Sequence, residues 1–195
     1  TVLAISNAVG STIAREAGGG IYLHAGLEIG VASTKVFTSQ IVALYLLSMA
    51  MGQRSGFLEK AKASSMIRSL KRLPEQVKGI LEKEGQIVEL ASLYADSANF
   101  LYLGRGYKFP VDLEGALKLK EVSYIHAEGY PAAEMKHGPI ALITEDMPVV
   151  FIATKDSAYG KVLVNIEEVK ARGGRIIAVA TEGDQEIAEK VDHVF

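Results

Sequence analysis

Three of the charged residues in the segment 114–121 have a spacing that suits acid–base chemistry. Glu114, Lys118 and Glu121 are four and three positions apart, and a helix turns by about 100° per residue, so all three share one face. A carboxylate and an ammonium held together in a cleft can divide proton abstraction and charge stabilisation between them. The more ordinary use of this spacing is a solvated ion pair on a helix surface.

The neighbours of this charged stripe favour a cleft over open solvent for at least part of it. Pro110 suits the N-terminus of the helix, which we expect to be largely buried. Few of the positions around the stripe suit contact with water, since they are small or apolar: Gly115, Ala116, Leu117, Leu119, Val122 and Ala127.

The histidines are a second source of acid–base groups. His137 precedes Gly138-Pro139 in a loop rich in Gly and Pro, where its imidazole can titrate near neutrality or simply be a surface group. His126 fits a core histidine with satisfied hydrogen bonds, and His24 and His193 are isolated near strand ends. None of them has the ligand clustering of a metal site.

A polar segment, GVASTK at 30–35, immediately precedes an apolar helix expected over 36–51. Ser33 or Thr34 can cap the N-terminus of that helix without any ligand. The same helix end, with two hydroxyls and Lys35, also suits sugar hydroxyls or an anion. Both interpretations stay open on the residues alone.

Short apolar runs bounded by Gly, Pro or charged residues predict the strands that carry these groups. They lie at 1–7, 100–103, 149–153 and 176–180. Helical segments separate the last three, and one of them, 157–171, ends before Gly173-Gly174. Apolar strands that alternate with helices predict an α/β fold with a parallel sheet covered on both faces, ordered strand, helix, strand, helix, strand in the second half.

An internal repeat suggests duplication of an α/β unit. Residues 1–18 align without gaps on 175–192, each as an apolar strand, a polar turn and a short helix with Ile-Ala at the same place. Any two strand–turn–helix units look somewhat alike, but the match over both elements favours duplication.

We divide the chain at 56 and 97. The part from 1 to 56 is predicted to be the end of a first α/β unit, and 57–97 a helical connector broken at Pro74 and Gly85. Residues 98–195 are predicted to form most of a second unit. A strand pattern at the first residue, without an initiator Met, suggests a fragment.

Composition narrows the classes of function. The chain has 195 residues, no cysteine and a formal net charge of −2, which excludes thiolate nucleophiles, disulfides and a basic surface for nucleic acid. The longest apolar run, Ile41 to Met51, is too short to span a bilayer and fits a buried core helix. These features are consistent with a cytoplasmic protein.

Two long motifs, GLEIGVASTK at 26–35 and EGALKLKEVSYIHAE…KHGP at 114–139, closely resemble the isomerase domain of the glucosamine-6-phosphate synthase family. The resemblance extends over essentially the whole chain, including LGRG at 103–106 and NIEEVKARGG at 165–174. It implies two sugar-isomerase (SIS) subdomains related by duplication, each a three-layer α/β/α structure with a mainly parallel sheet. Here the first subdomain would be partial and the second nearly complete.

The resemblance also implies roles for individual residues. Glu121 matches the base that moves a proton between C1 and C2, Lys118 the cation that stabilises the developing negative charge, and Glu114 an acid that helps in proton handling. His137 matches the histidine that opens the sugar ring. The loop that contacts the sugar corresponds to Val31, Ala32 and Ser33.

The same resemblance also implies substrates, a product and partners. It implies fructose-6-phosphate and ammonia as substrates, glucosamine-6-phosphate as product, and no metal or organic cofactor. It also implies a glutaminase domain elsewhere in the parent chain, and a homodimer in which His137 reaches the neighbouring subunit's site. The phosphate loop and a terminal imine-forming lysine of the family fall outside this sequence, so we expect the fragment itself to be weakly active or inactive.

Two other functions stay open. One is a stand-alone SIS enzyme, such as a phosphosugar isomerase/deaminase or a deglycase. The other is a non-catalytic SIS sensor of phosphosugars, which has no need of a base at Glu121.

Overall fold

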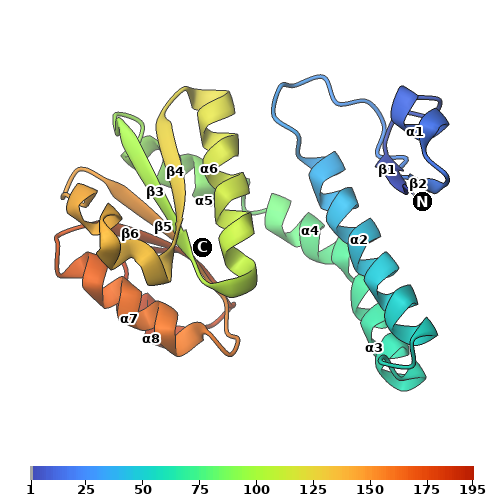
Figure 1. Cartoon of the computed structure of the whole chain (residues 1–195). Helices are drawn as coiled ribbons and strands as arrows, with labels where there is room; N and C mark the ends of the chain where they lie inside the picture. Colours follow the sequence, from blue (N-terminus) through green and yellow to red (C-terminus); the bar gives the residue numbers. More distant parts are fainter. Residues whose placement is uncertain (1) are drawn as a thin grey trace. The chain divides into compact units, whose positions relative to one another are not determined.

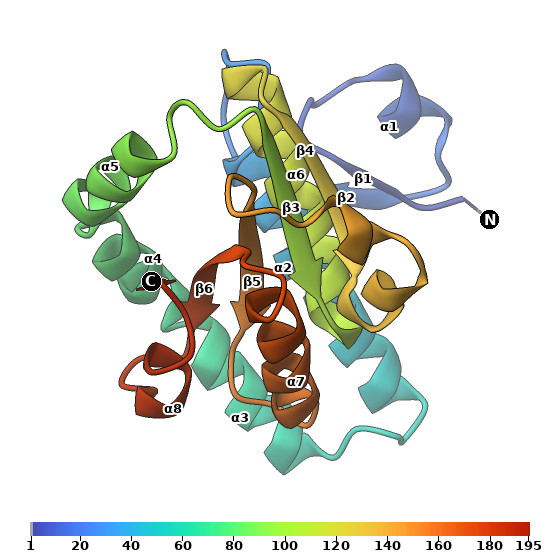
Figure 2. The same cartoon turned by 90° about the vertical axis from the view of Figure 1, so that its left-hand side faces the viewer.

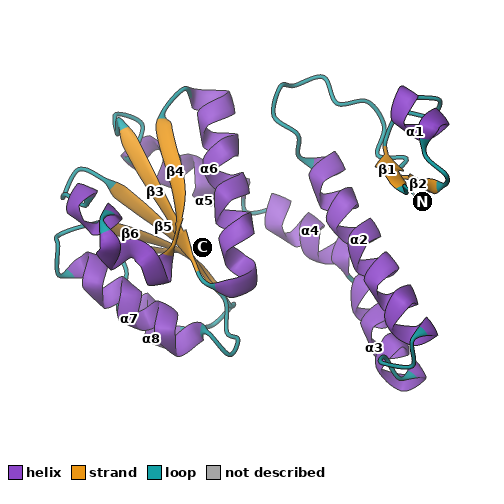
Figure 3. Ribbon diagram, viewed as in Figure 1, coloured by secondary structure: helices purple, strands orange, loops and turns teal. Residues whose placement is uncertain are grey.

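The computed structural model describes residues 2–195 and divides into two compact units, one ending at Glu89 and one beginning at Leu90. Figures 1 and 3 show the helices and strands of each. The division falls inside the segment 57–97 that the sequence predicts as a helical connector. Each unit is described by itself.

The first unit combines a small parallel sheet with long helices. Its elements are β1 (Ala4–Ser6), α1 (Thr12–Glu16), β2 (Gly20–Tyr22), α2 (Lys35–Arg54), α3 (Lys60–Leu70), α4 (Leu73–Leu81) and the start of α5 (Glu84–Leu93). Strands β1 and β2 pair in parallel, with Ile5 opposite Ile21. Pro74 lies in the first turn of α4, where its missing N–H costs no hydrogen bond.

Helix α2 differs from its sequence-based prediction in two ways. The helix is 20 residues long, so by length and composition it can cross a membrane, a test that core helices of soluble proteins also pass. The prediction of a buried core helix is wrong for this structure, because only Ala43 and Met49 are buried. Several of its apolar side chains are exposed, and those at Leu44, Tyr45 and Leu46 are 40–47% exposed.

The second unit is a five-stranded sheet flanked by helices. Its elements are the end of α5, then β3 (Asn99–Gly104), η1 (Gly106–Lys108), α6 (Phe109–Ser123), β4 (His126–Pro131), η2 (Ala132–His137), η3 (Pro139–Leu142), β5 (Pro148–Ala153), α7 (Tyr159–Lys170), β6 (Arg175–Ala180), α8 (Gln185–Ala188) and β7 (His193–Val194). The strand order is β4-β3-β5-β6-β7, with every pair parallel. This architecture confirms the predicted α/β class.

Alternating side chains along the strands build a core on each face of the sheet. One core joins the sheet to α7, η2 and η3, and contains Leu103, Phe151 and Ile176. The other joins it to α5 and α6, and contains Phe100 and Val150. Figures 1 and 2 show α6 and α7 on opposite sides of the sheet. A three-layer α/β/α arrangement therefore positions α6 over one face.

The structure also corrects the predicted order of elements in this half of the chain. Strand β4 was missed because its sequence, HAEGYP, has few residues that favour strands and includes Gly and Pro. It pairs with β3 at the edge of the sheet, where Asn99 lies opposite His126. The two-residue strand β7 was missed as well.

Both copies of the sequence repeat form the same local structure. In the first copy, β1 leads through a turn to α1, and β2 then pairs with β1 in parallel. In the second, β6 leads to α8, and β7 then pairs with β6 in parallel. The shared strand–turn–helix–strand order supports the inference of duplication.

Candidate active site

Helix α6 carries the charged stripe. Phe109 begins the helix and Pro110 occupies its first turn, as the sequence predicts. Tyr124 ends it in the left-handed conformation, with φ at 62° and its N–H bonded to the carbonyl of Lys120. Only Asp112 and Ala116 are buried, so the helix is less covered than we expected.

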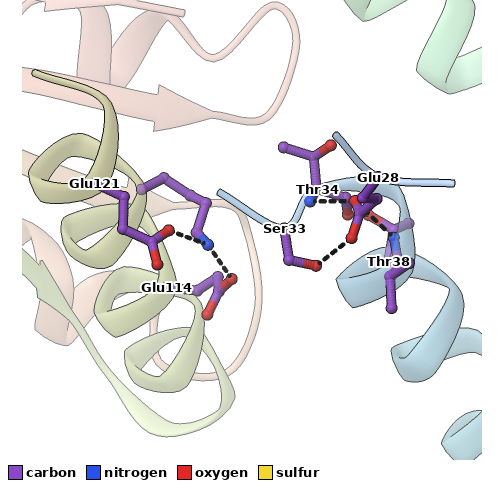
Figure 4. A network of polar contacts seen from close by, with 8 residues as sticks. Glu28, Ser33, Thr34, Thr38, Glu114 and Glu121 are labelled. Carbon is purple, nitrogen blue, oxygen red and sulfur yellow. Dashed lines mark hydrogen bonds and ion pairs between the residues drawn. The ribbon is translucent and has the colours of Figure 1, made fainter. Parts of the chain in front are cut away.

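The three residues of the stripe form a triad centred on one ammonium. Lys118 Nζ lies 2.7 Å from Glu121 Oε2 and 3.3 Å from Glu114 Oε1, and Figure 4 shows both contacts as dashed lines. The side chains are 22–25% exposed, so they are neither free in solvent nor sealed from it. Within residues 2–195, Glu121 Oε2 is shielded from water and has only the ammonium beside it. The structure thus brings together two carboxylates and one cation.

The electrostatics of the triad keep Lys118 charged. The hydrogen bond to Glu121, followed by that to Glu114, raises the pKa of the Lys118 ammonium above its ordinary value. Because one cation faces two carboxylates, the ionised triad has a net charge of −1. It can therefore offer a carboxylate as a base and an ammonium as an electrostatic partner for an oxyanion.

His137 lies at the end of η2, and its side chain is 76% exposed. Its Nε2 is 3.8 Å from Glu134 Oε2. Across residues 2–195, no hydrogen bond or ion pair links it to the triad. Its role therefore stays a prediction.

The interpretation of His126 as a core histidine is wrong. Its side chain is 61% exposed, and its two ring nitrogens lie 3.0 Å from Asn99 Oδ1 and 3.4 Å from Glu128 Oε1. The edge strand β4 leaves that side chain open to solvent.

The loop that contains Val31, Ala32 and Ser33 lies in the first unit, before α2. Val31 is 87% exposed, whereas Ala32 and Ser33 are partly buried. Thr34 is the N-cap residue by position, but its side chain makes no capping hydrogen bond. Glu28 supplies the acceptor instead, because its carboxylate accepts from the N–H of Thr34 at 2.9 Å.

Glu28 was not singled out from the sequence, and its carboxylate takes the place of a side-chain cap from Ser33 or Thr34 at this helix end. Its carboxylate also accepts from the N–H of Val36 at 3.4 Å, so it occupies the place where an external anion would bind. Lys35 donates from Nζ to the carbonyl of Leu27 at 2.6 Å. An anion site here is therefore disfavoured, and contact of this loop with sugar hydroxyls stays a prediction.

A second polar cluster that the sequence did not reveal lies at the carboxyl ends of β3 and β5. Lys108, 8% exposed, donates to the carbonyl of Thr154 and lies 3.1 Å from Asp156 Oδ2. Asp112 is fully buried, and this burial raises the pKa of its carboxyl to about 7. Ligands of open α/β sheets commonly bind at this edge, but here Lys108 already joins the two loops.

A protein-family model, the SIS domain, matches residues 93–195, which is more than half of the chain. This chain belongs to the SIS family. The match covers the whole five-stranded sheet and α6, so the triad lies within the SIS domain.

Relatives of this SIS chain extend the similarity across both units. It is 58% identical over 195 residues to a protein of Chlorobaculum tepidum named glutamine–fructose-6-phosphate aminotransferase [isomerizing], and covers 31% of that protein. A protein of the same name from Bacteroides thetaiotaomicron is 51% identical, with 98% of this chain and 31% of the relative covered. The chain thus spans about a third of the length of the curated relatives it matches.

A solved structure shows the same similarity in three dimensions. The C-terminal domain of glucosamine-fructose-6-phosphate aminotransferase from Francisella tularensis is 38% identical, with a TM-score of 0.93 over 99% of this chain and 55% of that one. Solved structures named as phosphosugar isomerases or deaminases at 18–24% identity share the fold alone.

Proposed function

We propose that this SIS chain is the isomerase part of a glutamine–fructose-6-phosphate aminotransferase, which converts fructose-6-phosphate and ammonia to glucosamine-6-phosphate. The observation that carries the proposal is the triad of Glu114, Lys118 and Glu121 on α6, with its contacts of 3.3 and 2.7 Å. The names of the relatives at 58% and 51% identity support this choice of substrate.

The triad has the groups that a C1-to-C2 proton transfer requires. A proton on the carbon beside a carbonyl or imine is weakly acidic, so its removal needs a fixed base and a group that stabilises the resulting charge. In the proposed mechanism Glu121 removes the proton from C1 of the open-chain sugar imine and returns it to C2. Lys118 stabilises the enolate-like charge between these steps, and Glu114 helps to hold the ammonium and handle protons.

Other residues supply the steps before the transfer. In the proposal His137 opens the sugar ring from the neighbouring subunit of a homodimer, and its exposed position leaves it accessible to a second chain. Val31, Ala32 and Ser33 contact the sugar. A glutaminase domain in the parent protein releases the ammonia from glutamine, and the protein acts in the cytoplasm.

The experiment that tests this function is product analysis with the natural full-length protein. Fructose-6-phosphate and glutamine are supplied, and hexose phosphates and amino sugars are separated. We expect glucosamine-6-phosphate from the wild type and none from Glu121→Gln. Only glucose-6-phosphate as product would favour a stand-alone isomerase, and binding without turnover would favour a sensor.

A further inference from the structure

Glu28 fixes the loop between residues 27 and 34 through contacts on both of its carboxylate oxygens. Oε1 accepts from the backbone N–H of Thr34 at 2.9 Å, and Oε2 accepts from the hydroxyl of Ser33 at 3.0 Å. Figure 4 shows these bonds between the labelled residues. The pKa of the Glu28 carboxyl is lowered, mainly by the Thr34 N–H, so the group is ionised at neutral pH.

The same loop is held at its beginning by another side chain. Asn7 Nδ2 donates to the carbonyl of Gly26 at 2.7 Å, and its Oδ1 accepts from the N–H of Ala25 at 2.9 Å. Gly26 has φ of 75°, a conformation that favours glycine. The loop is therefore anchored by Asn7 where it begins and by Glu28 where it joins α2.

We infer that Glu28 is a positioning residue that sets the hydrogen-bonding role of Ser33 toward the sugar. The Ser33 hydroxyl has one hydrogen, and it is donated to Glu28, so its oxygen can only accept from a ligand. A sugar hydroxyl can donate to that oxygen, whereas a phosphate dianion cannot. The Glu28 charge further disfavours a phosphate at this end of α2.

This inference rests on the proposed function, because it assumes that Ser33 contacts the sugar. Glu28→Gln tests it sharply. An amide oxygen can still accept from Thr34, but the amide NH2 donates and cannot accept the Ser33 hydrogen. The variant therefore preserves the length of the side chain and the backbone contact while it reverses the polarity at Ser33.

The experiment is a double-mutant cycle in the natural full-length protein, with conversion of fructose-6-phosphate to glucose-6-phosphate as the assay. The four proteins are wild type, Glu28→Gln, Ser33→Ala and the double variant. Glu59→Gln is the matched control, because Glu59 also precedes a helix of the first unit but makes no capping bond with its side chain.

We expect Glu28→Gln and Ser33→Ala each to lower kcat/KM about tenfold, mostly through KM. Ser33→Ala removes the hydrogen bond to the bound sugar, and Glu28→Gln removes the contact that orients the Ser33 hydroxyl for it. The double variant should be no worse than either single variant, and Glu28→Asp should recover part of the loss. Unchanged activity in Glu28→Gln would overturn the inference. The inference would also fail if the losses of the two single variants multiplied in the double variant. In that case Glu28→Gln would act without the Ser33 hydroxyl, as a general effect on folding would.

The same assay tests the proposed function separately, through the Glu121→Gln variant. If Glu121→Gln retains full turnover, the proposed function fails whatever Glu28 does. If Glu121→Gln is inactive and the cycle shows no coupling, only the inference about Glu28 fails.

Discussion

The carboxylate of Asp112, at the start of α6, packs directly against the backbone of Gly104, at the end of β3. A Cβ on residue 104 would lie 1.7 Å from Asp112 Oδ2, so no larger residue fits there without a shift of the helix or strand. Together with the apolar core between α6 and the sheet, this contact holds the helix, and therefore the triad, against the sheet.

Replacement of Gly104 by Ala is expected to destabilise the protein by about 1–3 kcal/mol, because it overpacks a fully buried contact. Urea unfolding monitored by circular dichroism measures the change. Gly160→Ala is the matched control, since Gly160 lies in helix α7 with open space around the position of a Cβ. The control should be neutral or slightly stabilising, and equal losses in both variants would contradict the account.

Asp112 should also give the protein a dependence of stability on pH. Burial raises its pKa in the folded state from 3.8 to about 7, against the opposing effects of the Ile152 N–H and the Lys108 ammonium. Between pH 3.8 and about pH 7, Asp112 therefore holds a proton in the folded state that it has lost in the unfolded state. The contribution of this group to the free energy of unfolding is therefore highest below pH 4. It falls as pH rises toward 7, by at most about 1.4 kcal/mol per pH unit.

Asp112→Asn removes this titration. We expect the variant to be more stable than the wild type at pH 8 and to lose the decline between pH 4 and 7. Chemical unfolding at several pH values tests this. A variant that is less stable than the wild type at pH 8 would show that the ionised carboxylate stabilises the fold through Lys108.

Lys118→Met tests the electrostatic role of the triad. Without the ammonium, two carboxylates face each other on α6, and no cation stabilises the enolate-like charge. We expect kcat for sugar isomerisation to fall about 10²–10³-fold, because nothing then stabilises the developing negative charge. A variant that keeps the wild-type kcat would argue against an electrostatic role for Lys118.

The proposed shared site predicts complementation between inactive variants. Full-length His137→Gln and Glu121→Gln proteins are each expected to be nearly inactive. When the two are mixed under conditions that allow subunit exchange, a mixed homodimer has one site with both defects and one site with neither. About a quarter of wild-type activity should return. No recovery, despite demonstrated exchange, would place His137 and Glu121 in the same subunit's site.

The sequence predicted the elements that depend on strong local patterns. The strands β3, β5 and β6 are apolar runs, and the stripe on α6 follows from the spacing of its charges. Strand β4 escaped prediction because its place at the sheet edge depends on pairing with β3 rather than on its own residues.

Other features depend on contacts that no local pattern records. Glu28 caps α2 from six residues before Thr34, and Asp112 is buried because Gly104 leaves room for it. The exposure of α2 likewise depends on which elements cover it, and not on its own composition.

The measurement that tests the central claim most directly is the rate of fructose-6-phosphate isomerisation by the full-length Glu121→Gln protein. Fructose-6-phosphate binding is measured in parallel, and Glu82→Gln serves as an exposed control. The account predicts a loss of about 10²–10⁴-fold in kcat with binding retained, while the control keeps its activity. Turnover of Glu121→Gln at the wild-type rate would contradict the assignment of Glu121 as the base, and with it the proposed mechanism.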